Sequence, residues 1–294
     1  MTALAVPAPP AAPARDRERW LAWGFAGPSL AVLALLFALP LALLLAASLS
    51  DGSGLSLAEY ARLLGTGHYL GVIWNSLRLA LLTTLIALAI GYPAAFALAR
   101  ARGGLRSLLL ASLFLPLAAS VIVKAFAWTI LLRSDGIVNT VLVAAGILAE
   151  PVRMIFTETA LIVGSVNIFL PFMILPIYTV VAQLDPRLTD AAATLGASPV
   201  AAFLRVVVPL TIPGIVAGVA LVFSLSVSAY VVPTLLIGER YPTLSTTIAK
   251  AYLLARQPAF GAAAGVVLLV IAVAVVALGS RLGRAGGGRT GGGR

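Results

Sequence analysis

Six long apolar runs separated by short polar segments dominate the pattern of hydrophobic and polar positions along this chain. They cover residues 20–49, 72–98, 107–132, 157–181, 206–236 and 259–280. Each run is long enough to cross the hydrocarbon core of a bilayer, which takes ~20 apolar residues in helical form. The pattern therefore predicts an all-α, polytopic membrane protein with six transmembrane helices.

Two further apolar segments are too short to cross a bilayer. Residues 137–148 are uniformly apolar, and residues 243–255 are amphipathic. We expect both to form re-entrant or surface helices on the outer side, because counting 137–148 as a seventh span would reverse the side on which every later loop lies.

Composition agrees with a membrane protein and leaves no room for a soluble enzyme domain. Hydrophobic residues make up 61% of the chain, charged residues make up only 10%, and the mean hydropathy is +1.07. A soluble domain carries ~25% charged residues. The chain has no cysteine, no phosphate-binding GxxxxGK[ST] motif and a single histidine, His68, so we expect no disulfide, no metal site and no catalytic residue.

The basic residues predict the orientation. In the six-span scheme, twelve of them lie in segments 1–19, 99–106, 182–205 and 281–294, against six in the outer segments. Because Lys and Arg concentrate in cytoplasmic loops, we expect both termini to lie in the cytoplasm. The chain itself is expected to be a multi-pass protein of the inner membrane. The net charge of +10 is then a matter of topology and of contact with the lipid bilayer, and no nucleic-acid partner is expected.

These boundaries give four parts. Residues 1–19 are expected to be a disordered cytoplasmic tail, and residues 20–69 the first transmembrane helix with its outer loop. Residues 70–280 are expected to form a core domain that contains the cytoplasmic loop 182–205. Residues 281–294 are expected to be a disordered basic cytoplasmic tail.

The loop 182–205 carries signals for two short helices with a bend between them. Asp185 can cap a first helix with Pro186 in its first position, and Gly196 can end that helix in a left-handed conformation. Ser198 and Pro199 repeat the start signal for a second helix. The small residues between them would let a partner surface approach the bend closely.

The same loop resembles the cytoplasmic signature of ABC importer permease subunits. That signature reads Glu-Ala-Ala, three residues, Gly, nine residues, a branched apolar residue, one residue, Leu and Pro. The chain has Asp190-Ala191-Ala192, then Gly196, then Val206, Val208 and Pro209 at that spacing, with Asp in place of Glu and Val208 in place of Leu. The resemblance implies that Asp190, Ala191, Ala192 and Gly196 dock onto a cytoplasmic ATPase and couple it to transport.

Other motifs are similar to the spermidine/putrescine branch of these permeases. They are Asn75-Ser76-Leu77-Arg78, Gly91-Tyr92-Pro93, Ala127-Trp128, Leu170-Pro171-Phe172-Met173 and Tyr230-Val231-Val232-Pro233. The resemblance covers roughly residues 70–280. It implies a polyamine as the favoured substrate, with an opine-like amino-acid derivative, thiamine and ferric iron as alternatives.

The resemblance also implies partners. They are two ATP-binding subunits, a second homologous permease subunit (a different chain or another copy) and an extracytoplasmic solute-binding protein. ATP and Mg²⁺ would be used by the partner ATPase, and this chain would bind no cofactor itself. A rival of another class is an ion-gradient-driven secondary carrier. It is disfavoured because none of the ten acidic residues lies in the middle of a predicted span.

Polar and aromatic side chains within the spans are candidates for the substrate path, because charge and polarity are costly in a bilayer. We select Lys124, Trp128, Asn167 and Tyr230. Three of them have a structural alternative: Lys124 extending to the interface, Asn167 bonding to a neighbouring helix, and Tyr230 lying at the interface. Arg78 is expected to reach the outer interface.

Overall fold

Helices account for nearly all regular structure in the described residues, which are 15–50, 54–185 and 187–287 of a computed structural model. In chain order they are α1 (Arg15–Ser48), α2 (Ala58–Gly65), α3 (Gly67–Arg100), α4 (Gly103–Ala118), α5 (Val121–Leu131), α6 (Ile137–Ala144), α7 (Glu158–Val181), α8 (Arg187–Thr194), α9 (Pro199–Ala202), the π-helix η1 (Phe203–Val207), α10 (Val208–Ser228), α11 (Val231–Leu236), the 3₁₀-helix η2 (Gly238–Arg240), α12 (Leu244–Leu253) and α13 (Pro258–Gly287). The all-α prediction is confirmed.

Five helical stretches of the described residues are long and apolar enough to cross a membrane by themselves. They are Ala26–Ser48, Gly67–Arg100, Glu158–Val181, Pro199–Ser228 and Pro258–Arg281. A sixth candidate is the pair α4 and α5, which passes the same test only as two pieces bent by 102°. The predicted number of six spans is therefore reached only by counting this bent pair as one.

The bend in the third span differs from the single straight helix predicted for 107–132. Pro116 lies in the last turn of α4, and Ala119 then adopts an extended conformation. Ser120 starts a new helix by accepting a hydrogen bond from the backbone N–H of Ile122 at 3.3 Å. A proline that weakens the turn and a new cap four residues later together explain why the chain changes direction here.

The fifth span also ends earlier than residue 236. The helix stops at Ser228, Ala229 is extended, and α11 starts afresh at Val231. Pro233 has no N–H to donate to the carbonyl of Ala229, four residues earlier. The hydroxyl of Ser245 donates to that carbonyl instead, so the break is stabilised by the neighbouring α12.

The short segments form short helices as predicted. Residues 137–148 contain α6, of eight residues, and residues 243–255 contain α12, of ten residues. The segment after the first span also contains α2, an amphipathic helix that the sequence analysis did not predict. Neither α6 nor α12 is long enough to cross a bilayer.

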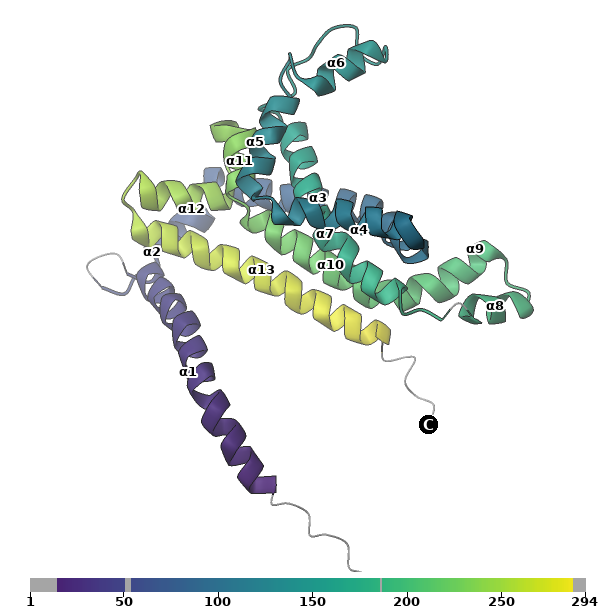
Figure 1. The fold of residues 1–294 in the computed structure, drawn as a ribbon. Coiled ribbons are helices and arrows are strands. Elements are labelled where there is room, and N and C mark those ends of the chain that lie inside the picture. Colours follow the sequence, from purple (N-terminus) through teal and green to yellow (C-terminus); the bar gives the residue numbers. More distant parts are fainter. Residues whose placement is uncertain (1–14, 51–53, 186, 288–294) are drawn as a thin grey trace, which may run out of the picture.

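The helices α3, α7 and α10 form the centre of the molecule, and α13 packs against α10 (Figure 1). Leu161, Met173 and Ile177 of α7 are buried in their shared core. Glycines allow the close approach: a Cβ at Gly214 would lie 2.9 Å from the Pro176 carbonyl oxygen, and one at Gly218 would lie 2.8 Å from the Met173 sulfur. Packing through small residues is the usual way in which membrane helices associate.

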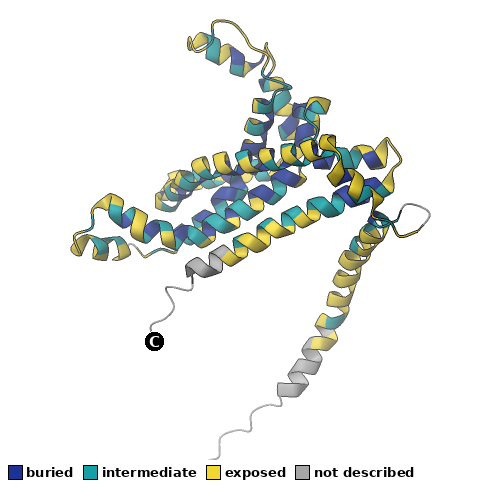
Figure 2. Cartoon of the chain, turned by 180° about the vertical axis from the view of Figure 1, so that it is seen from behind, coloured by how far each residue is buried: buried dark blue, intermediate teal, exposed yellow. Residues whose placement is uncertain are grey.

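The first span stands apart from this bundle. α1 leans away from the other long helices, and contacts α13 near its own C-terminal end (Figures 1 and 2). Its apolar side chains, such as Leu33, Leu36 and Phe37, are exposed. An apolar exterior of this kind suits a lipid environment.

The boundaries predicted for the two tails need correction. α1 already begins at Arg15, so 15–19 belong to a helix, and α13 continues to Gly287, so 281–287 do too. Both extensions continue an apolar helix that can propagate by one hydrogen bond per added residue. The remaining tail residues, 1–14 and 288–294, lie outside the described residues.

Candidate functional site

The loop between α7 and α10 forms two short helices that project beyond one end of the long helices (Figure 1). The carboxylate of Asp185 accepts a hydrogen bond from the backbone N–H of Arg187 at 2.9 Å, which is a cap of the predicted kind. Pro186, the residue between them, lies outside the described residues. α8 therefore begins where the sequence indicated.

Gly196 ends α8 with a φ of +83°. The N–H of Gly196 bonds to the carbonyl of Ala193, and the N–H of Ala197 bonds to the carbonyl of Ala192, at 2.9 and 3.0 Å. This pair of bonds is the Schellman arrangement, in which the residue with positive φ is usually glycine. A Cβ at Gly196 would meet no atom within 4 Å, so the backbone conformation and not the available space requires glycine here.

The second helix starts as predicted and then runs directly into a transmembrane span. The Ser198 hydroxyl accepts a hydrogen bond from the N–H of Ala201 at 3.2 Å, and Pro199 occupies the first turn. α9, η1 and α10 follow without a break, so residues 199–228 form one continuous rod. Any force applied to α9 therefore acts directly on this span.

The surface of these two helices is exposed and partly apolar (Figure 2). Leu195 is 89% exposed and Val200 is 67% exposed, on opposite sides of the bend at Gly196. Asp190 and Ala191 are exposed as well, whereas Ala192 is half-buried. A protruding bend with apolar side chains and a carboxylate has the chemistry of a docking surface.

The candidate path residues lie on several helices, and the structure brings two of them into contact. The indole N–H of Trp128 on α5 donates to the side-chain oxygen of Asn167 on α7 at 3.1 Å. Lys124 lies one turn before Trp128 on the same helix, and Tyr230 lies at the start of α11, which packs against α5. The interhelical bond considered for Asn167 is therefore present.

Arg78 makes an ion pair that was not predicted. Its guanidinium lies 3.0 Å from the carboxylate of Glu158, the first residue of α7. The nearby hydroxyl of Tyr241 donates to the backbone carbonyl of Asn75, while burial raises the pKa of Tyr241. These contacts join α3 and the start of α7 to the loop before α12.

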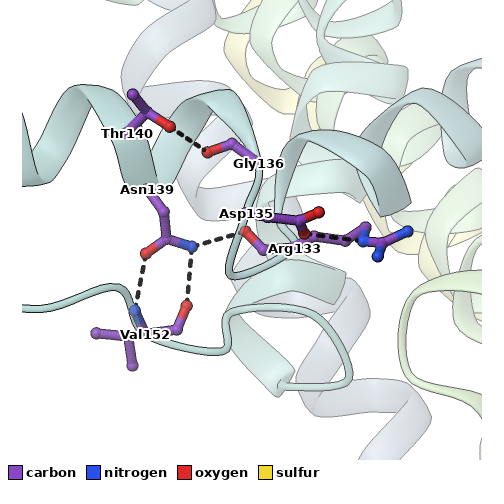
Figure 3. A network of polar contacts seen from close by, with 6 residues as sticks. All are labelled: Arg133, Asp135, Gly136, Asn139, Thr140 and Val152. Carbon is purple, nitrogen blue, oxygen red and sulfur yellow. Dashed lines mark hydrogen bonds and ion pairs between the residues drawn. The ribbon is translucent and has the colours of Figure 1, made fainter.

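Asn139 organises the segment that carries α6 (Figure 3). Its side-chain amide donates to the carbonyls of Arg133 and Val152, both at 2.8 Å, and its oxygen accepts from the N–H of Val152 at 2.9 Å. Only 1% of Asn139 is exposed. A single buried amide thus closes the segment from 133 to 152 into one unit, which projects from the bundle in Figure 1.

The sequence analysis missed an aromatic cluster beside the loop between α7 and α10. Tyr92 and Phe96 of α3 contact Phe203, the first residue of η1. The spacing of Tyr92 and Phe96, one helical turn apart, was the available signal, because residues at i and i+4 share a helix face. No group of three or more His, Cys, Asp or Glu side chains gathers in the described part of the chain.

Comparisons with known proteins give one consistent result. A family model described as "Binding-protein-dependent transport system inner membrane component" matches residues 91–285. The chain is 39% identical over 203 residues to the spermidine/putrescine transport system permease protein PotB of Haemophilus influenzae. The aligned residues cover 69% of this chain and 71% of that protein.

Solved structures show the same fold. A chain of a bacterial ABC transporter involved in the import of the acidic polysaccharide alginate matches with a TM-score of 0.77 and 19% identity, covering 92% of this chain and 98% of that one. The alginate transporter in complex with a pentasaccharide-bound periplasmic protein matches with a TM-score of 0.72 and 20% identity, covering 92% and 96%. At these identities the likeness concerns the fold alone.

Proposed function

The chain belongs to the family of binding-protein-dependent transport system inner membrane components, and we propose that it carries a polyamine, spermidine or putrescine, across the inner membrane. As a permease subunit of an ABC importer it is a non-catalytic, multi-pass transport subunit. The observation that carries the substrate proposal is the 39% identity to a spermidine/putrescine permease over more than two thirds of both chains.

The bend at Gly196 is proposed as the contact with the ATPase. Asp190, Ala191 and Ala192 lead into it, and the apolar side chains on either side are exposed. One ATP-binding subunit would dock at this bend. A second ATP-binding subunit would dock on a second homologous permease. ATP and Mg²⁺ belong to those subunits, and both termini of this chain share their side of the membrane, as the distribution of Arg and Lys supports.

Lys124, Trp128, Asn167 and Tyr230 are proposed to line this subunit's half of the path. The rings of Trp128 and Tyr230 offer faces that attract ammonium groups. The amide of Asn167, oriented by Trp128, offers a neutral polar contact. Lys124 adds a positive charge that would shorten the stay of a cationic substrate and favour its onward movement.

The test is uptake by the complete importer, with its ATPase, second permease and binding protein, reconstituted in proteoliposomes. We expect labelled spermidine to accumulate only when ATP is supplied, and to continue to do so when ion gradients are collapsed by an ionophore. Uptake that needs an ion gradient and ignores ATP would contradict the importer mechanism. ATP-driven uptake of thiamine, ferric iron or an opine, with none of a polyamine, would overturn the substrate proposal alone.

A further inference from the structure

The rod formed by α9, η1 and α10 contains a π-helical turn directly after α9. In η1 the N–H of Val208 bonds to the carbonyl of Phe203, five residues earlier, instead of four. Such a turn accommodates one extra residue and is frequent at functional positions. Here it lies where the cytoplasmic helix α9 becomes the span α10, so it sets the direction of α9 relative to the span.

The first residue of this turn contacts the side of α3. The ring of Phe203 lies edge-on to Tyr92 and Phe96, with centroids 6.3 and 5.7 Å away, and those two rings lie 5.0 Å apart. The guanidinium of Arg100 lies over Phe96 at 5.9 Å from the ring centroid. We call Tyr92, Phe96 and Phe203 the aromatic clasp. Edge-to-face pairs of this kind fix the relative positions of two helices.

A hydrogen bond supports the clasp two turns further along the rod. The hydroxyl oxygens of Tyr92 and Thr211 are 3.0 Å apart. The Thr211 hydroxyl donates its own hydrogen to the carbonyl of Val208 at 2.9 Å, so Tyr92 is the donor in this pair. Tyr92 therefore contacts the rod twice, through its ring at Phe203 and through its hydroxyl at Thr211, which is itself fully buried.

A proline within α3 provides a position at which this helix can bend, directly beside the clasp. Pro93 directly follows Tyr92 within α3 and cannot donate the hydrogen bond that would reach Ala89. A proline in this position is a common cause of a helix kink. Residues 94–100 can therefore change direction relative to the upper part of α3 at small cost.

Empty space also lies beside the rod. A cavity of about 360 Å³ lies between Val206, Val207 and Leu210 of the rod, the end of α7 and Leu188 of α8, and it is also lined by Phe96 and Arg100 of α3. This space allows the rod to shift relative to α7. The ring contacts of Phe203 with Tyr92 and Phe96 hold the rod to α3 beside this space.

We propose that the aromatic clasp is a transmission element: Phe203 positions α9 against Tyr92 and Phe96, so that a displacement of α9 moves the cytoplasmic third of α3 together with the rod. This inference rests on the proposed function, in which the ATPase displaces α9. It makes Phe203 a positioning residue of the coupling step, distinct from the proposed docking residues Asp190, Ala191, Ala192 and Gly196. The rod and α3 then respond to the ATPase as one unit bending at Pro93.

The first test measures uptake and ATP hydrolysis side by side in the complete importer. Phe203→Ala is expected to reduce the solute imported per ATP hydrolysed about tenfold, because the ring contacts are lost. The co-purified ATPase should stay at the wild-type amount. Phe203→Tyr keeps the ring and is expected to restore the ratio. Phe37→Ala removes a 74% exposed phenylalanine of α1 and serves as the matched control.

The second test does not depend on a variant that disturbs packing. Since the chain has no cysteine, spin labels can be placed on Ala97→Cys of α3 and Leu204→Cys of the rod, with Val276→Cys on α13 as a reference. All three positions are exposed. On ATP binding, the distance between 97 and 204 is expected to stay constant, while the distances from both to 276 change.

The outcomes separate this inference from the proposed function. A wild-type importer that neither binds the ATPase nor takes up solute would contradict the proposed function itself. A working wild type in which Phe203→Ala leaves the import-to-hydrolysis ratio unchanged would overturn the clasp. So would a distance between 97 and 204 that changes on ATP binding as much as the distances to α13.

Discussion

At the scale of residues, the structure shows that a few side chains and one backbone conformation determine the shape of the loop between α7 and α10. Gly196 adopts a φ of +83° and its neighbours complete the bond pattern that ends α8. Asp185 and Ser198 cap the two helices on either side. These are local interactions between residues close in sequence, which is why all three could be predicted.

Substitution of Gly196 tests whether this backbone conformation matters for coupling. In Gly196→Val a branched side chain would be forced into the left-handed region, at a cost of about 1–3 kcal/mol. We expect α8 to end differently, ATP-driven uptake to fall below a tenth of the wild-type rate, and membrane insertion to be normal. Thr194→Val, an isosteric change in the same helix, is the control. Normal uptake by Gly196→Val would remove the coupling role of the bend.

An ion pair on the opposite side of the molecule provides a test by pH. The ammonium of Lys250 on α12 lies 2.7 Å from the carboxylate of Glu239 and holds the pKa of Glu239 below its ordinary value, first through the hydrogen bond and then through its charge. A lowered pKa in the folded state means that the pair stabilises the loop above the unfolded pKa of Glu239. That contribution is lost as the pH falls through the lowered value.

The expected result is a shift in the titration of one carboxyl group. In Lys250→Gln, the midpoint of Glu239, followed by NMR of a selectively labelled carboxyl carbon, should rise toward the ordinary range of glutamate. Arg240→Gln removes the adjacent cation and should leave the midpoint nearly unchanged. An equal shift in both variants would show that general charge, and not the pair with Lys250, determines the pKa.

At the scale of elements, the spans that break are the part that the sequence did not reveal. Hydropathy is continuous across 107–132 and 206–236, so a window of apolar residues predicts straight helices there. Proline alone does not mark the breaks, because Pro93, Pro171 and Pro176 lie inside helices that continue. Whether a helix breaks at a proline depends on whether a new cap or another element supplies the missing hydrogen-bond partner. At Ala229 that partner comes from α12, which is a tertiary contact.

The break after α10 illustrates this and leads to a prediction. Pro233 leaves the carbonyl of Ala229 without its helical donor, and the Ser245 hydroxyl on α12 donates to it. Ser245→Ala removes that donor from a largely buried site, which costs about 1–3 kcal/mol. We expect a lower midpoint of thermal unfolding for the purified chain and faster amide exchange at residues 229–236.

A matched serine on another helix provides the control. Ser280→Ala removes an exposed hydroxyl whose hydrogen bond stays within α13, so it should leave both readouts nearly unchanged. If Ser245→Ala is as stable as wild type and exchanges no faster at 229–236, the bond between α12 and Ala229 does not support the break.

At the scale of the whole molecule, the order of the apolar spans followed from the sequence, but their arrangement did not. The contact between Trp128 and Asn167, 39 positions apart, depends on how α5 turns after its bend. The aromatic clasp likewise joins Tyr92 and Phe203 across more than a hundred residues. Periodicity places each of these residues on a face of its helix, and only the packing of α3, α7 and α10 determines which faces meet.

The arrangement also explains how one subunit contributes to a larger machine. The central bundle extends into the α9 rod at one end and carries the closed segment around Asn139 near the other (Figures 1 and 3). The proposed contact with an ATPase and the closed segment around Asn139 thus lie on opposite sides of the same packed core. Motion at one end can reach the other through α10, which is continuous over residues 208–228.

The most direct measurement of the central claim is co-purification of the tagged chain from its native membrane in mild detergent, beside an Asp190→Arg variant. The wild type is expected to bring down an ATP-binding subunit and a second permease. In Asp190→Arg the ATP-binding subunit should be lost while the second permease remains, because a cation replaces the exposed carboxylate at the proposed docking bend. A wild-type chain that purifies alone, or a variant that retains the ATPase in full, would contradict the account.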